Sequence, residues 1–171
     1  MAAVGSRTPS LQRALESSSA EETAELGRAL GRLLAPGDFI GLVGELGAGK
    51  TQFVRGVADG AGVAKSEVAS PSFAIVYPYR GRLPLYHADL YRVADEDELY
   101  ATGFFDLLGV EAALLVEWLD RVPAAAPPEL LLVRIEVEGE NKRRLVAQAF
   151  GDRPRALLES WAPAPSGRGQ G

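Results

Sequence analysis

Hydrophobic and polar positions follow two different periods along the chain, and each change of period marks the end of one element. Apolar residues three and four positions apart predict helices over 19–34, 49–60, 95–103 and 153–161. Alternating or unbroken apolar runs predict strands over 39–43, 73–79, 83–88, 113–117, 130–139 and 143–151. This order predicts an α/β fold, a single domain with a mixed parallel and antiparallel sheet flanked by helices. Strands 39–43 and 113–117 are expected to lie parallel at its centre.

Capping and breaking residues indicate where several of these elements begin and end. Ser19 and Glu22 have the spacing of a capping box, so the first helix is expected to begin there. Pro78 lacks a backbone donor and therefore predicts that strand 73–79 lies at a sheet edge. Residues 1–18 carry few large apolar side chains and are expected to be a flexible arm. Residues 19–161 are expected to form the folded domain, and residues 162–171 a disordered tail.

Composition and charge narrow the class of protein. The 171 residues suit one domain, and 47% of them are apolar, which is enough for one core. The net charge of −5 argues against a broad nucleic-acid footprint, which requires a basic face. No stretch approaches the roughly 18 apolar residues of a membrane span, and the chain has no cysteine and no apolar signal-peptide core. We therefore expect a soluble, cytoplasmic protein that does not enter a membrane.

The stretch GELGAGKT at 44–51 matches G-x-x-x-x-G-K-[ST], the phosphate-binding loop. It follows a predicted strand and precedes a predicted helix, which is the context that the motif requires. Glycines let successive N–H groups turn inward around phosphate oxygens, and the helix adds its unpaired amides. Lys50 is expected to reach the β- and γ-phosphates, and Thr51 to bind Mg²⁺. The predicted nucleotide-binding residues are Gly44, Glu45, Leu46, Gly47, Ala48, Gly49, Lys50, Thr51 and Gln52.

Two acidic residues at the ends of predicted strands are candidates for the metal site and for catalysis. Glu117 ends the apolar run LLVE and is expected to bind Mg²⁺ directly or through water, unless it is an ordinary strand-end Glu in solvent. Asp89 follows LYHA and is expected to order the metal's water shell or the attacking water, unless it is a turn or cap residue. Lys50, Asp89 and Glu117 are the predicted catalytic residues.

The remaining candidates depend on less specific signals. Ser70 and Ser72, in SPSF, offer hydroxyls that could sense the γ-phosphate, or they form a Ser-Pro turn with no ligand. Trp118 either packs near the nucleotide or fills the sheet edge. His87, the only histidine, is interpreted as a structural strand residue. Asn141 begins NKRR, which lacks the Asp of the guanine-reading Asn-Lys-x-Asp motif, so ATP is favoured over GTP.

Four segments taken together, GELGAGKTQFVRG, SPSFAIVYPY, LYHADLYR and LVEWLDR, resemble the TsaE family, also called YjeE. The resemblance spans residues 20–150. It implies a P-loop fold, ATP hydrolysis that is weak alone, and work with TsaD and TsaB type proteins. These proteins form threonylcarbamoyladenosine on tRNA, which this chain would contact only indirectly. The family also encloses its nucleotide with backbone near Ser19 and Ala20 and with the late hairpin near Lys142 and Arg143.

The resemblance also assigns roles residue by residue. Lys50 matches the phosphate lysine of the family, and Thr51 and Glu117 match its Mg²⁺ ligands. Asp89 matches the acid of the His-x-Asp motif, and Trp118 matches the Trp beside the metal-binding acid. The segment with Ser70 and Ser72 matches the first switch. Three positions depart from the family pattern. Gln52 stands where a second Thr is common, Ser72 where a Thr is common, and Ala88 where a larger residue is common.

The function expected from these observations is a Mg²⁺-dependent ATPase that resets a TsaD–TsaB transferase complex between turnovers. Two other readings stay open. A P-loop kinase of a small hydroxyl substrate would need an acceptor pocket and an arginine-bearing lid, for which Arg80, Arg82 and Arg92 are available. A nucleotide-gated binding module would need no useful hydrolysis.

Overall fold

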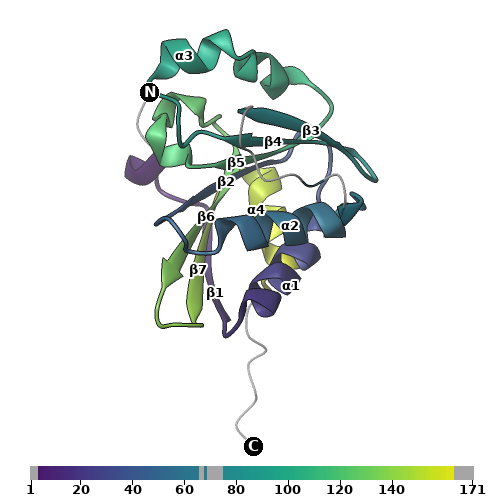
Figure 1. Ribbon diagram of the computed structural model, residues 1–171, viewed down its shortest axis with the longest axis vertical. Helices are drawn as coiled ribbons and strands as arrows, with labels where there is room; N and C mark the ends of the chain where they lie inside the picture. Colours follow the sequence, from purple (N-terminus) through teal and green to yellow (C-terminus); the bar gives the residue numbers. More distant parts are fainter. Residues whose placement is uncertain (1–3, 66–67, 69–74, 164–171) are drawn as a thin grey trace, which may run out of the picture.

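Seven strands form one mixed sheet, which divides the helices between its two faces (Figure 1). The computed structural model describes residues 4–65, 68 and 75–163. The strands are β1 (Leu11–Ser17), β2 (Phe39–Gly44), β3 (Val76–Arg80), β4 (Pro84–Asp89), β5 (Ala113–Glu117), β6 (Leu130–Val137) and β7 (Arg143–Phe150). Their order across the sheet is β1-β7-β6-β2-β5-β4-β3.

The helices lie in two groups because each face of the sheet buries its own apolar cluster. One face carries α1 (Ala20–Gly31), α2 (Lys50–Gly60) and α4 (Asp152–Trp161). The other face carries α3 (Glu96–Ala101) and the 3-10 helices η1 (Val4–Ser6), η3 (Phe104–Gly109), η4 (Leu119–Arg121) and η5 (Pro123–Ala125). No helix in the described ranges has the length and apolar composition that a bilayer crossing requires.

The centre of the sheet is parallel, as the sequence predicts. β2 pairs parallel with β5, which places Leu42 opposite Glu117. β5 in turn pairs parallel with β4, which places Asp89 opposite Glu117. The carboxyl ends of these three strands therefore meet at one edge, where ligands bind in open α/β sheets. The predicted late hairpin is also confirmed, since β6 and β7 pair antiparallel with Leu130 opposite Phe150.

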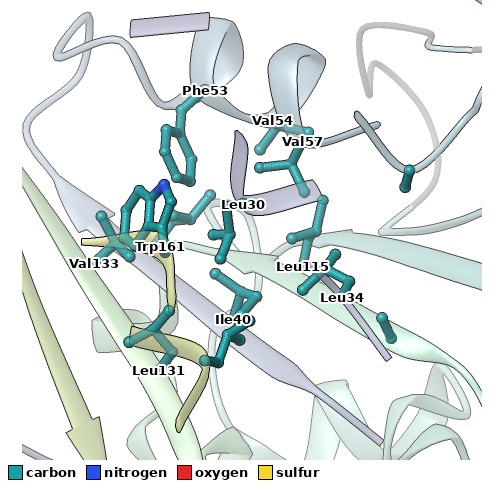
Figure 2. Packing of buried hydrophobic residues seen from close by; sticks show 14 of the residues in the cluster. Leu30, Leu34, Ile40, Phe53, Val54, Val57, Leu115, Leu131, Val133 and Trp161 are labelled. Carbon is teal, nitrogen blue, oxygen red and sulfur yellow. The ribbon is translucent and has the colours of Figure 1, made fainter. Parts of the chain in front are cut away.

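The core under α1, α2 and α4 is built from aromatic and branched side chains of helices and central strands (Figure 2). Phe53 of α2 and Trp161 of α4 face each other with ring centroids 5.9 Å apart, and Leu30 of α1 lies beside them. The indole Nε1 of Trp161 donates to Leu26 O at 2.9 Å, so the polar atom of this ring is satisfied. Because Phe53 belongs to the first turn of α2, these contacts also position the loop before that helix.

Helices α1 and α2 approach each other closely because glycines line their contact. Each helix presents two glycines four residues apart, Gly27 and Gly31 on α1 and Gly56 and Gly60 on α2. A Cβ at any of the four would lie under 3.0 Å from a carbonyl oxygen of the facing helix, a separation that real Cβ atoms essentially never show. The two backbones therefore set the distance between the helices, as small residues do at other close helix contacts.

The prediction of a flexible arm over 1–18 is wrong for residues 11–17. They form β1, an edge strand that pairs antiparallel with β7, from Leu11 opposite Ala149 to Ser17 opposite Arg143. Leu11 and Leu15 pack against the core under α1 and α4. Two large apolar side chains are too few to predict a strand, and the partner strand lies near the other end of the chain.

Other boundaries differ by a few residues. Within the described residues, the strand predicted over 73–79 begins at Val76, and it is the edge strand that Pro78 predicts. The predicted N-cap is confirmed, because Ser19 Oγ accepts from the Glu22 N–H at 3.0 Å, while the return bond differs from a capping box, since Glu22 Oε2 accepts from the Ser18 N–H at 2.6 Å. Ala162, placed in the predicted tail, is buried directly after α4, while residues 164–171 lie outside the described part of the chain.

We predict that Gly56→Ala destabilises the protein although alanine is the better helix former. The new methyl group would meet the Ala24 carbonyl of α1, and overpacking of this kind costs about 1–3 kcal/mol. Helix propensity alone would instead add about 1 kcal/mol of stability. Urea unfolding followed by circular dichroism measures the change. The control is Gly109→Ala, since a Cβ at Gly109 meets nothing within 4 Å. Equal unfolding midpoints for the two variants would contradict the close helix contact.

Candidate nucleotide-binding site

The loop at 44–51 joins the end of β2 to the start of α2, and its backbone takes a shape that glycine permits. Gly47 and Gly49 have φ of +79° and +109°, in a region that side chains disfavour. A Cβ at Gly44 would lie 2.6 Å from Ile135 O of β6. No side chain caps the first amides of α2, because the N-cap residue is Gly49. These uncapped amides at a helix N-terminus, in a loop shaped by glycines, fit a phosphate group.

Lys50 is buried within this loop and is held by three contacts. Its Nζ donates to Gly44 O at 2.6 Å and to Glu45 O at 2.7 Å. The same ammonium lies 4.1 Å from the centre of the Trp118 ring. Burial lowers the pKa of Lys50, and nearby carboxylates, Glu117 first among them, oppose that shift. A phosphate in the loop would compete with the two carbonyls for the protons of this ammonium.

The connection between β6 and β7 contacts the loop from a second side. Arg143, the first residue of β7, donates from Nε to Ala48 O at 2.9 Å, and Ala48 is fully buried. Arg143 Nη1 also donates to Gly139 O at 3.0 Å, within the same connection. The observed bond ties the middle of the loop to the sheet. The sequence motif does not locate it, although the family resemblance places this hairpin near the nucleotide.

Asp89 and Glu117 end the adjacent parallel strands β4 and β5, and they lie opposite each other in register. Glu117 is buried, and its Oε2 lies 2.6 Å from His87 Nε2. Asp89 Oδ1 accepts from the Tyr91 N–H at 3.0 Å. Burial raises the pKa of Asp89; the Tyr91 N–H opposes this shift, and the charge of Glu117 adds to it. The two predicted acids are therefore brought together at one edge of the sheet.

Trp118 follows β5 in a strained backbone conformation. Its φ is +58°, and across the described ranges it is the one residue other than glycine with a positive φ. Strain of this kind costs on the order of 1–3 kcal/mol and is concentrated at functional sites. The ring packs on Tyr91 with centroids 4.8 Å apart, and on the Lys50 ammonium. The structure thus places Trp118 beside the lysine of the loop.

Most of the predicted site residues line one cavity of about 260 Å³. The lining consists of Leu46, Gly47, Gly49, Lys50, Thr51, Gln52, Asp89, Tyr91, Glu117 and Trp118. Gly44, Glu45 and Ala48 belong to the same loop, and their carbonyl groups or close packing hold it in shape. The predicted switch residues Ser70 and Ser72 lie outside the residues that the structure describes.

Thr51 and Glu117 are the residues of this cavity that could hold Mg²⁺. A hydroxyl and a carboxylate supply the oxygen ligands that Mg²⁺ prefers, and this ion usually keeps several waters and binds substrate phosphates. Residues 4–65, 68 and 75–163 contain no group of three or more His, Cys, Asp or Glu suited to a metal. Thr51 and Glu117 supply one hydroxyl and one carboxylate, and this donor pair fits a metal whose other ligands are waters and phosphates.

Two residues that contact the site are absent from the predicted set. His87 bonds Glu117, and Tyr91 packs on Trp118. His87 is buried and hydrogen-bonded, as its structural interpretation requires, but its partner is the predicted metal ligand. The segment LYHADLYR contains a pattern from which His87 could have been predicted as a site residue. Side chains alternate along a strand, so His87 lies on the same face as the predicted site residue Asp89.

Two further observations concern regions away from the loop. Arg82, a candidate lid arginine, donates to Gly31 O at 3.1 Å and to Leu34 O at 2.9 Å. These bonds hold the Arg82 side chain at the end of α1 and the residues that follow it. A second cavity, of about 370 Å³, is lined by residues of α1, of α2 and of the segment after α2, and among them is the ion pair of Arg28 with Asp59. Its lining includes none of the predicted site residues.

This chain is similar in sequence and in fold to known proteins of one family. The family described as "Threonylcarbamoyl adenosine biosynthesis protein TsaE" matches residues 17–145. The tRNA threonylcarbamoyladenosine biosynthesis protein TsaE of Bacillus subtilis (strain 168) is 38% identical over 140 residues, covering 81% of this chain and 87% of that protein. The protein of the same name from Treponema pallidum (strain Nichols) is 36% identical over 129 residues, covering 75% and 95%. The crystal structure of Bacillus subtilis YdiB matches with a TM-score of 0.76 and 30% identity, covering 92% of this chain and 97% of that one.

We predict that Asp89→Asn stabilises the protein at neutral pH. Burial raises the pKa of Asp89 in the folded state, so the ionised carboxylate lowers stability once the pH exceeds the ordinary aspartate pKa of about 3.9. Asn is uncharged at every pH and keeps an oxygen for the Tyr91 N–H. Below the ordinary aspartate pKa, Asp89 is protonated in both the folded and the unfolded state, so the destabilisation by its ionised carboxylate vanishes. The gain should grow as the pH rises through the folded-state pKa and then stay constant.

Urea unfolding between about pH 3 and about pH 8 measures this difference. Asp120→Asn removes the same charge at an exposed position and serves as the control. A gain that does not change with pH, or one equal to that of Asp120→Asn, would contradict the role of burial.

Proposed function

The chain belongs to the TsaE family, and we propose that it is a Mg²⁺-dependent ATPase. In this proposal it acts with TsaD and TsaB type proteins in forming threonylcarbamoyladenosine on tRNA, and it resets the transferase complex between turnovers. One observation carries the proposal. The loop, Lys50, Thr51 and the strand-end acids Asp89 and Glu117 line the same cavity. Groups of these types at these places serve ATP hydrolysis in P-loop proteins.

The chain's own groups bind the triphosphate in two ways. The amides of the loop and the positive end of α2 surround the phosphates. Lys50 offers its ammonium to the β- and γ-phosphate oxygens in exchange for the Gly44 and Glu45 carbonyls. Because Lys50 is only 5% exposed, solvent screens its attraction to the phosphates little.

The hydroxyl of Thr51 and the carboxylate of Glu117 would hold Mg²⁺, directly or through water. When bound, the ion neutralises charge on the phosphate oxygens. Asp89, beside Glu117, accepts a hydrogen bond from the attacking water and orients it. The raised pKa of Asp89 makes it a stronger base than an ordinary aspartate.

Trp118 is proposed to report the nucleotide to a partner protein. Its ring contacts both Lys50 and Tyr91, and Tyr91 is 44% exposed. A triphosphate that draws Lys50 away from the loop carbonyls would change this packing at the surface. Ser70 and Ser72 stay in the proposed switch on the family resemblance. The net charge of −5 favours action through partners over direct binding of tRNA, and we place this action in the cytoplasm.

Lys50→Ala is expected to weaken ATP binding at least roughly 10-fold, since hydrogen bonds to charged groups are worth about 1.5–3 kcal/mol. Isothermal titration calorimetry with a non-hydrolysable ATP analogue measures the affinity. Lys65→Ala is the matched control, because Lys65 is an exposed lysine of the second cavity, away from the loop. Parent-like affinity in Lys50→Ala would remove the loop as the nucleotide site.

Glu117→Gln is expected to slow Mg²⁺-dependent phosphate release at least about 10-fold, since even a group behind a metal ligand contributes about 10–100-fold. Release is measured for the parent and the variant, each with and without TsaB and TsaD, alongside modified tRNA. The parent should release phosphate faster with both partners than alone. Glu111→Gln, at an exposed position two residues before β5 begins, should behave as the parent does. Phosphate release unaffected by the partners, with modified tRNA formed equally without this chain, would contradict the proposal.

A further inference from the structure

Three buried polar side chains form a chain that runs from the edge of the sheet to Glu117. The Tyr79 hydroxyl of β3 lies 3.2 Å from His87 Nδ1, and His87 Nε2 of β4 lies 2.6 Å from Glu117 Oε2 of β5. Tyr79, His87 and Glu117 are 4%, 3% and 4% exposed. Water therefore competes little for either hydrogen bond.

His87 approaches Glu117 from the core and not from the cavity. Side chains alternate along β4, so His87 and Asp89 share a face of the sheet. Asp89 is in register with Glu117 and lines the cavity, whereas His87 is in register with the fully buried Leu115. His87 is therefore placed to hold Glu117 from behind while the cavity side of the carboxylate stays accessible to a ligand.

For the neutral form of the imidazole, the chemistry of the three groups gives each hydrogen bond one direction. A carboxylate has no hydrogen to donate, so His87 Nε2 carries the hydrogen and donates to Glu117. The Nδ1 atom of the same ring is then the acceptor, and the Tyr79 hydroxyl donates to it. Burial raises the pKa of Tyr79 to about 12, so this hydroxyl keeps its hydrogen at neutral pH.

We propose that Tyr79 and His87 are positioning residues for Glu117. Tyr79 donates to Nδ1 and so supports the ring form, with the hydrogen on Nε2, that the carboxylate of Glu117 requires, and His87 holds Oε2 of Glu117. This arrangement leaves the other oxygen, Oε1, for Mg²⁺ or for a water bound to it. The inference rests on the proposed function, because only there is Glu117 assigned to the metal.

A purely structural role makes a different prediction. Breaking a buried polar chain that only satisfies its own hydrogen bonds lowers stability. It does not change the factor by which Mg²⁺ strengthens nucleotide binding. The positioning role predicts that this factor falls while the affinity for nucleotide in EDTA stays the same.

The experiment uses the full chain and four variants. His87→Leu removes the donor to Glu117, His87→Gln keeps a donor of similar reach, and Tyr79→Phe removes only the hydroxyl. Tyr86→Phe is the matched control, because Tyr86 precedes His87 on β4 and packs against the cluster on the opposite face. Calorimetry gives the affinity for a non-hydrolysable ATP analogue in Mg²⁺ and in EDTA. The ratio of the two affinities reports what the metal contributes.

We expect His87→Leu to reduce this ratio by about 10-fold and Tyr79→Phe by about 3-fold, while Tyr86→Phe leaves it unchanged. His87→Gln should restore it to within about 3-fold of the parent, and all variants should keep the parent's affinity in EDTA. A parent-like ratio in His87→Leu, or equal losses in His87→Leu and His87→Gln, would overturn the positioning role. If His87→Leu does not fold, a Tyr79→Phe ratio equal to that of Tyr86→Phe overturns it instead.

Failure of the proposed function gives a separate result. A parent protein with equal affinities in Mg²⁺ and EDTA would overturn the metal assignment of Glu117, and the positioning role with it. His87 also provides a readout without nucleotide, because it is the only histidine in the chain. Nitrogen NMR of its imidazole should show the hydrogen on Nε2 in the parent and a smaller share of that form in Tyr79→Phe. A hydrogen on Nδ1 in the parent would overturn the proposed chain, whatever the hydrolysis assays show.

Discussion

The parallel pairing of β2, β5 and β4 is the constraint on which the site depends. Because the three strands run in one direction, the loop after β2, Glu117 of β5 and Asp89 of β4 reach the same edge of the sheet. The register matters as much as the direction. A slip of one residue in β5 would turn Glu117 to the opposite face, away from His87 and from the cavity that it lines.

The loop between β2 and α2 keeps its place because it is held from several sides. The four glycines between α1 and α2 bring the two backbones together, and Phe53 packs on Trp161 at the first turn of α2. The bond from Arg143 to Ala48 O adds a link to the β6–β7 connection. A phosphate site formed by main-chain amides needs this support, because the loop itself has few side chains with which to pack.

The site gathers features that stability alone would not select. It contains a buried ammonium at Lys50, a buried carboxylate at Glu117, an Asp89 whose pKa burial raises and a Trp118 with positive φ. Each of these opposes folding or adds strain. Departures of this kind from consistent local preference are concentrated at functional sites. Their concentration around one cavity, in a chain of the TsaE family, agrees with a functional site at this edge of the sheet.

The sequence by itself determined the features that a few neighbouring residues encode. These are the loop GELGAGKT between strand and helix, the cap at Ser19, the edge position of Pro78 and the parallel centre that ends at Glu117. The tertiary structure alone decided that residues 11–17 form a strand, that Arg143 bonds Ala48 and that His87 bonds Glu117. The two bonds join residues 95 and 30 positions apart. The physical reason is that such contacts depend on which strands become neighbours and in what register, and local periodicity specifies neither.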